Sequence, residues 1–422
     1  QMFSHNVQYL SLSPEIGRSI ATIEGYMGDA DTAISPEGED VAKGILQCLM
    51  GTEDAGALIE HIEKLSVSTD DDKEDVESLR KEIKKQEDTR DVLLVGIDDE
   101  ETRETVASTF NDKIALLKDK ITQTEGRFSA TTLENDELAT LMELARRRRS
   151  LESIFLPYDA KDSRGTLEAY ARRSTGTKKA QALNAITHLR DRYHIAEVAH
   201  YKKISVVMAS IGYTRERKDP PEGAPGQVVP VVLNGYINTE RDTPKSYIYA
   251  LPAATEAIEI KLSPARVLAW CIEDVGWNDP GQEITGSDEE SLKHLVLMSP
   301  ALRMDPMDFM RDAKDFPAAT LAPFHLLHTI SHCLVGTAKR HTGYDDKSIS
   351  EYLLPMNMSI LLYVSSVQNY TSGGLRMLFE HYLRQWMDDA CNYAFSCAFD
   401  PICSDKGSTC SGCVQIILGC ET

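Results

Sequence analysis

The chain has 422 residues, of which 42% are hydrophobic and 26% are charged, a composition typical of a folded globular protein and not of a disordered one. Its net charge of −21 and isoelectric point near 5.0 repel nucleic acid, so any contact with DNA requires a local basic patch or a basic partner. No secretory signal opens the chain and no apolar run approaches the roughly 20 residues that span a bilayer, so we expect a cytoplasmic protein without membrane contact.

Helical patterns dominate the first half of the chain. Residues 1–55 have a helical pattern, and from 56 to 150 apolar residues recur every three or four positions among many charges, as at Val106, Phe110 and Ile114. This spacing predicts long, exposed amphipathic helices that pair as a charged hairpin.

Two basic segments are candidates for contact with DNA or an acidic partner. The first follows a predicted helix at 136–145 and consists of Arg146, Arg147, Arg148 and Arg149. A helix C-terminus, which attracts cations, is the alternative explanation for it. The second lies in a predicted helix at about 165–200, where a solvated helix face is the simpler explanation; its basic residues are Arg172, Arg173, Lys178 and Lys179.

Strand patterns begin near residue 202, and turn residues at 220–226 predict an exposed loop among them. Helical patterns return at 263–271 and 288–297. The predicted strands cover 203–208, 211–215, 228–233, 247–251 and 257–262.

An apolar helix predicted at 324–337 carries three histidines. His328 and His332 are four residues apart and therefore lie on one helix face, with His325 one turn earlier. That spacing suits a metal, but Thr329 stands where the HExxH metalloprotease motif has glutamate. The pattern favours a polar stripe that is hydrogen-bonded in the core or that faces a neighbouring domain or partner.

A buried strand is predicted at 358–364, and a helix at 375–390 follows the glycine pair Gly373-Gly374. The order strand, glycine turn, helix is also found at the start of phosphate-binding units. The sequence contains no GxxxxGK[ST] motif and no GxGxxG motif at this turn, however. We therefore attribute the glycines to a tight turn and close helix packing, and expect no nucleotide site.

Nine cysteines occur, and their distribution separates two groups. Cys48, Cys271 and Cys333 stand among apolar neighbours and are predicted to be small buried hydrophobic residues. The other six crowd the last 32 residues, which in a long cytosolic chain indicates metal binding in preference to disulfides.

Four thiolates surround a zinc ion tetrahedrally, and a CxxC pair supplies two of them from one turn. Cys410 and Cys413 form such a pair. A closed shell of this kind is structural and not catalytic, and reduced cysteines without metal are the alternative. The predicted ligands are Cys403, Cys410, Cys413 and Cys420, with Cys397 in reserve and Cys391, on the preceding helix, the weakest choice.

These patterns predict an α+β protein whose N-terminal half is helical and whose mixed C-terminal half ends in a four-cysteine zinc knuckle. The predicted divisions are a helical region at 1–200 that contains the hairpin, a strand-rich middle domain at 201–320 and a zinc-binding domain at 321–422.

The last hundred residues resemble a known family in four features: the helix segment His328-Thr329-Ile330-Ser331-His332, the strand Ile360–Val364, the Gly373-Gly374 turn and the cysteines from Cys397 onward. Together they resemble MZB, the zinc-binding domain that ends MrfA/YprA-type DNA helicases and occurs in DrmB, the helicase partner in the DISARM antiphage system. The segment Cys397–Cys403, with Asp400-Pro401, is most similar to the DrmB-type version. Weaker similarity at Ile211–Arg215 and Thr255–Ile260 extends the resemblance over roughly residues 200–422.

The resemblance implies a structural zinc ion and a hetero-complex with a helicase or ATPase subunit, which contacts DNA through that complex. Because the sequence lacks helicase motifs, we expect a non-catalytic accessory subunit of bacterial antiphage defence. One alternative is a C-terminal fragment of a larger helicase. Another is a metal- or histidine-dependent hydrolase or nuclease that uses His325, His328 or His332 with Asp345 and Asp346. A third is a module that binds DNA directly through its basic segments.

Overall fold

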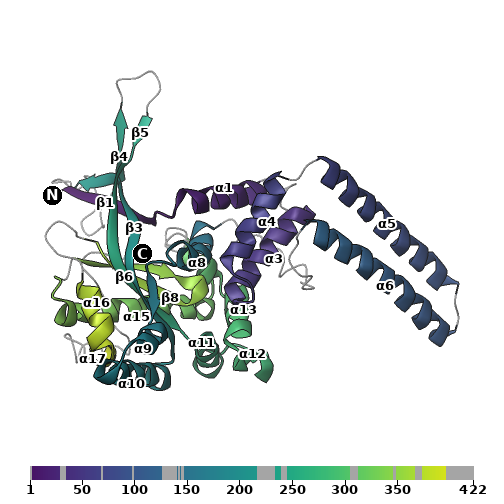
Figure 1. Cartoon of the computed structure of the whole chain (residues 1–422). Coiled ribbons are helices and arrows are strands. Elements are labelled where there is room, and N and C mark those ends of the chain that lie inside the picture. The colour runs from purple at the N-terminus through teal and green to yellow at the C-terminus, as the bar shows by residue number, and fades with distance from the viewer. Residues whose placement is uncertain are drawn as a thin grey trace, which may run out of the picture. The chain divides into compact units, whose positions relative to one another are not determined.

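The computed structural model describes residues 2–28, 35–67, 70–96, 99–125, 140, 143, 147–215, 233–238, 245–304, 312–345, 348–365 and 373–395. Contacts divide the chain into two compact units (Figure 1). Unit 1 comprises Gln1–Ser13 and Phe155–Thr422, and unit 2 comprises Pro14–Ile154. The predicted divisions at 200 and 320 differ from this, because one sheet crosses both positions.

Unit 1 is built on an antiparallel sheet with the strand order β5-β4-β3-β6-β8-β7. Strands β1 and β2 also pair with β3, which is long enough to hold several partners. The fold is therefore α+β, as the sequence predicts. The strands are β1 (Met2–Leu10), β2 (Arg164–Thr166), β3 (Ile195–Arg215), β4 (Leu233–Asn238), β5 (Lys245–Tyr247), β6 (Tyr249–Leu262), β7 (Ile349–Leu354) and β8 (Ser359–Val364).

Strand β1 corrects the helical prediction for the first ten residues. It runs antiparallel to β3, with Leu10 opposite Val206. The Leu10 side chain is 1% exposed and packs in a core with Tyr201, Tyr352 and Tyr363. A local pattern misses this strand because its partner lies about 200 residues later in the sequence.

Helices cover this sheet (Figure 1). The helix α15 (Ala318–Thr342) packs on β7 and β8 and is contacted in turn by α17 (Leu383–Phe395). A short helix, α16 (Gly374–Met377), and a π-helical segment, Leu378–Tyr382, lead into α17. The other α-helices among the described residues of this unit are α9 (Leu167–Arg173), α10 (Gly176–Tyr193), α11 (Pro264–Trp270), α12 (Gln282–Gly286) and α13 (Asp288–Met298).

Unit 2 is helical. Two 26-residue helices, α5 (Asp70–Val95) and α6 (Glu100–Glu125), pack against each other inside the range 56–150 where the sequence predicts a hairpin. Their contact is a narrow apolar seam of Ile83, Ile114 and Ile121. The part of this unit that the structure describes also contains α1 (Pro14–Gly28), α3 (Pro36–Met50), α4 (Ala55–Val67) and α8 (Arg148–Asp159), the last of which continues into unit 1.

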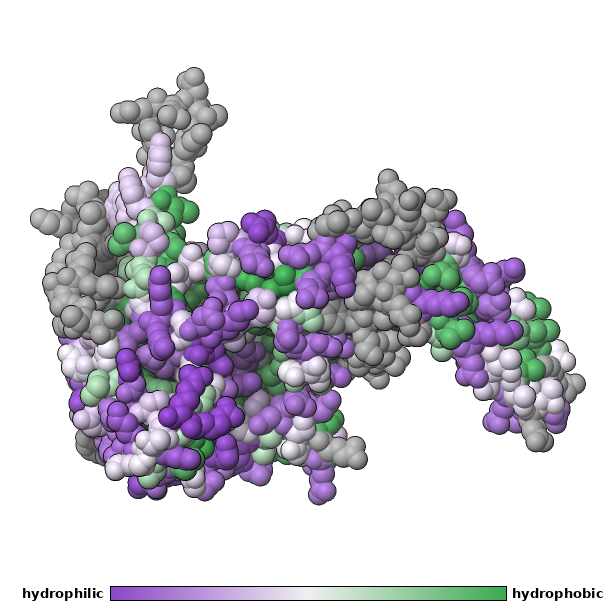
Figure 2. Space-filling view, viewed as in Figure 1, coloured by the Kyte–Doolittle hydropathy of each residue, from purple (hydrophilic) through white to green (hydrophobic). Residues whose placement is uncertain are grey.

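Several apolar side chains of the hairpin face solvent, and Figure 2 shows hydrophobic surface along it. The exposed fraction is 74% for Val92, 87% for Val95 and 60% for Leu116. Among the described helices, none combines the length and the apolar character needed to cross a membrane.

Candidate functional site around His328, His332 and Glu351

Helix α15 places two histidines over the sheet. It ends at Thr342 and is followed by Gly343, whose φ of 75° is the left-handed conformation that commonly follows a helix C-terminus. Its apolar side chains, among them Leu327 and Leu334, are buried in the core. His328 and His332 lie one turn apart with ring centroids separated by 4.3 Å and ring planes at 80°.

Both rings meet one carboxylate from β7. Glu351 Oε1 lies 3.2 Å from Nε2 of His328 and 3.4 Å from Nε2 of His332. The Glu351 side chain is fully buried, while the histidine side chains are 18% and 11% exposed. Burial alone raises the pKa of the Glu351 carboxyl, but the two histidines outweigh burial and lower it. Glu351 is therefore a buried anion that requires a neighbouring cation.

These three residues could hold a metal ion. Their ligand atoms lie within 4.8 Å of one another, and two imidazoles with one carboxylate form a common donor set for zinc. His325 lies on the same helix, and burial together with His328 lowers its pKa.

Sequence reasoning identified both histidines but missed Glu351. The strand Ile349–Leu354 is buried along its whole length. A charged side chain in such a strand indicates that another polar or charged side chain pairs with it. The carboxylates that the sequence favoured are different ones. Asp345 accepts a hydrogen bond from Ser348 at 2.7 Å, and Asp346 lies outside the described residues.

The glycine pair has a structural explanation. Gly373 has a φ of 137°, which only glycine adopts readily, and a Cβ at Gly374 would lie 2.5 Å from the ring of Tyr344. The prediction of a tight turn with close packing is therefore confirmed at this position.

A buried carboxylate of the chain itself accepts the backbone amides of this turn. Glu256, on β6, is 3% exposed and accepts hydrogen bonds from Tyr344 Oη at 2.7 Å and from the Gly373 amide at 2.7 Å. It also accepts from the backbone amides of Leu375 and Arg376 at 3.2 and 3.1 Å. Burial raises the pKa of Glu256, but these donors and His200 outweigh it and bring the pKa to about 2.

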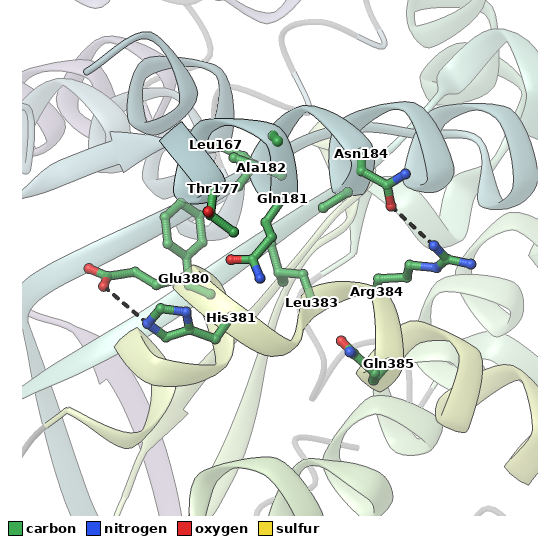
Figure 3. A pocket seen from close by; sticks show the side chains of 13 residues that line it. Leu167, Thr177, Gln181, Ala182, Asn184, Glu380, His381, Leu383, Arg384 and Gln385 are labelled. Atoms are coloured by element: carbon green, nitrogen blue, oxygen red, sulfur yellow. Dashed lines mark hydrogen bonds and ion pairs between the residues drawn. The ribbon is translucent and has the colours of Figure 1, made fainter. Parts of the chain in front are cut away.

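A surface hollow of about 360 Å³ lies between α10 and the segment that leads into α17 (Figure 3). Two pairs of its polar side chains interact: Arg384 donates to Asn184 at 3.1 Å, and Glu380 lies 3.8 Å from His381.

Three arginines of the run lie within ion-pair distance of two carboxylates. Arg148 and Arg149 lie in the first turn of α8, so the interpretation of a helix C-terminus is wrong for these two. Both approach Glu152, at 3.0 and 3.8 Å, and Arg147 lies 3.5 Å from Glu143. Arg146 lies outside the described residues, and the side chains of Lys178 and Lys179 are exposed on α10.

The described residues do not include 396–422, so they contain none of the predicted zinc ligands Cys403, Cys410, Cys413 and Cys420, nor the reserve Cys397.

The other cysteines lie among the described residues. Cys391 is a free, partly buried thiol on α17. Cys271 and Cys333 are buried, as the sequence predicts, whereas Cys48 is only partly buried. Burial raises the pKa of the Cys271 thiol to about 12.

Comparison with known proteins found no relative of this chain. No protein-family model matches the chain, and no curated protein matches it.

Proposed function

We propose that this chain is a zinc-bearing accessory subunit that docks on a DNA helicase or translocase of bacterial antiphage defence and helps it engage DNA. The partner supplies ATP hydrolysis, and the chain supplies a docking surface braced by a structural zinc ion. The observation that carries the proposal is the resemblance of the last hundred residues to the DrmB-type zinc-binding domain.

Two properties of the described residues support this function. The charged hairpin of α5 and α6 carries exposed apolar side chains at Val92, Val95 and Leu116, which suit contact with another protein. The backbone amide of Gly373, at the glycine turn, donates to Glu256 of the same chain, in keeping with a structural role for that turn. In this proposal motor activity belongs to the partner.

Zinc, in this proposal, is held by Cys403, Cys410, Cys413 and Cys420, whose four thiolates form a closed donor set. The ion supplies folding free energy to the terminal segment and performs no chemistry.

The experiment is co-purification of the tagged full chain with the helicase encoded beside it, followed by loading of that helicase on forked DNA with and without the chain. We expect a stable complex and faster loading when the chain is present. The Cys410→Ser/Cys413→Ser variant should lose zinc and weaken the complex, while the matched Cys391→Ser variant should keep both. Normal loading without the chain, and no recovered complex, would refute the proposal.

The cluster of two histidines and Glu351 favours a second candidate, a metal-dependent hydrolase, because two imidazoles and one carboxylate leave a coordination position open for water. The test is hydrolysis of DNA by the zinc-loaded chain alone. Activity that His328→Ala abolishes and His325→Ala keeps would establish the hydrolase in place of the accessory role.

A further inference from the structure

We infer that His328, His332 and Glu351 form a zinc-binding site of their own, separate from the terminal cysteines, in which two imidazoles and one carboxylate are the protein ligands. The inference concerns a different part of the chain from the cysteine cluster and stands whether or not the accessory function does. It rests on ligand distances, on the elements that supply the ligands and on burial.

The distances fit coordination. An N–H···O hydrogen bond usually spans about 2.9 to 3.0 Å, whereas the two Nε2 atoms lie 3.2 and 3.4 Å from Oε1 of Glu351. A tetrahedral ion with bonds of about 2.0 to 2.1 Å separates its ligand atoms by roughly 3.3 Å. The observed separations match that tetrahedral edge.

The supporting elements fix the ligands before any ion arrives. His328 and His332 are one turn apart on a 25-residue helix, so the spacing of their backbones is set by the helix itself. Glu351 is held in β7, which pairs along its full length with β8. An ion at this point would join α15 to the sheet on which it packs.

Burial and donor chemistry select the class of ion. Nitrogen and oxygen donors in a two-to-one ratio suit a divalent transition metal such as zinc better than calcium or magnesium, which prefer oxygen donors alone. The carboxylate is fully buried, and the partial exposure of both histidines leaves a route for the ion. Three protein ligands leave the fourth position to water or to a donor from a partner.

The test is titration of the metal-free full chain with Co²⁺, monitored by ultraviolet and visible absorption, together with X-ray absorption of the zinc-loaded chain. Thiolate ligands give cobalt an intense charge-transfer band that imidazole and carboxylate ligands lack. We expect one nitrogen- and oxygen-ligated ion per chain in addition to any thiolate-ligated ion. His332→Ala should weaken that ion's binding about a hundredfold, because each ligand of a zinc site supplies a large share of its affinity.

His325→Ala is the matched control, because it removes an imidazole from the same helix outside the proposed ligand set, and it should leave binding unchanged. Circular dichroism checks that each variant is folded, and Glu351→Gln provides a second variant that removes a donor with little change of volume. Cys410→Ser/Cys413→Ser should remove only thiolate-ligated metal, which separates failure of the cysteine proposal from failure of this one. A wild-type chain that binds only thiolate-ligated ions, or a His332→Ala chain with unchanged affinity for the nitrogen-ligated ion, would overturn the inference.

Discussion

At the scale of single residues, Glu256 shows how one buried carboxylate can organise a turn. It joins β6 to the start of α16 and to Tyr344 through hydrogen bonds to both of its oxygens. The change in its pKa from 4.5 to about 2 corresponds to roughly 3 kcal/mol of stabilisation. We expect Glu256→Gln to lower the free energy of unfolding by about 2 to 4 kcal/mol, measured by urea denaturation. Glu273→Gln, in an exposed ion pair with Arg266, should change it by less than about 1 kcal/mol.

Glu256 also predicts a pH dependence. Because its pKa is lower in the folded chain than in the unfolded one, its contribution is complete above about pH 4.5 and is lost as the pH falls towards 2. The difference in urea midpoint between wild type and Glu256→Gln should therefore be largest at neutral pH and shrink on acidification. A difference that grows at low pH would show that another group controls this turn.

At the scale of elements, the hairpin of α5 and α6 has a thin core. Ile114 is 5% exposed within the seam, whereas Leu116, two residues later, is 60% exposed. Ile114→Ala should destabilise the hairpin by about 2 to 4 kcal/mol and raise amide hydrogen exchange across both helices. Leu116→Ala should leave exchange nearly unchanged, since it removes a solvent-exposed side chain. Equal exchange in the two variants would mean that the seam does not hold the helices together.

At the scale of the whole molecule, the strand β1 ties the start of the chain to a core formed by much later residues. Leu10 packs with Tyr352 in that core, and its backbone amide donates to Tyr352 Oη at 3.3 Å. Leu10→Ala should therefore cost about 2 to 5 kcal/mol in the unfolding of unit 1, followed by thermal or urea denaturation. Leu251→Ala, at an apolar side chain that is 62% exposed, is the control and should cost less than about 1 kcal/mol. A similar small cost for Leu10→Ala would show that β1 contributes little to that core.

The sequence by itself determined the local elements, because hydrophobic spacing and turn residues act over short windows. The α+β class, the helix α15, the strand β8 and the role of the glycine pair are all predictable from such windows. The helix predicted at about 165–200 is instead two helices, α9 and α10, and the residues from 195 onward belong to the strand β3. The same local evidence placed His328 and His332 on one helix face.

Only the tertiary structure decided what those residues meet. Glu351 joins the two histidines from a strand about twenty residues away, and Glu256 reaches Gly373 across 117 positions of sequence. The strand β1 likewise became visible only through its pairing with β3. Side-chain periodicity reports which face of an element is buried, but not which distant element covers it, because that choice depends on how segments far apart in the sequence pack together.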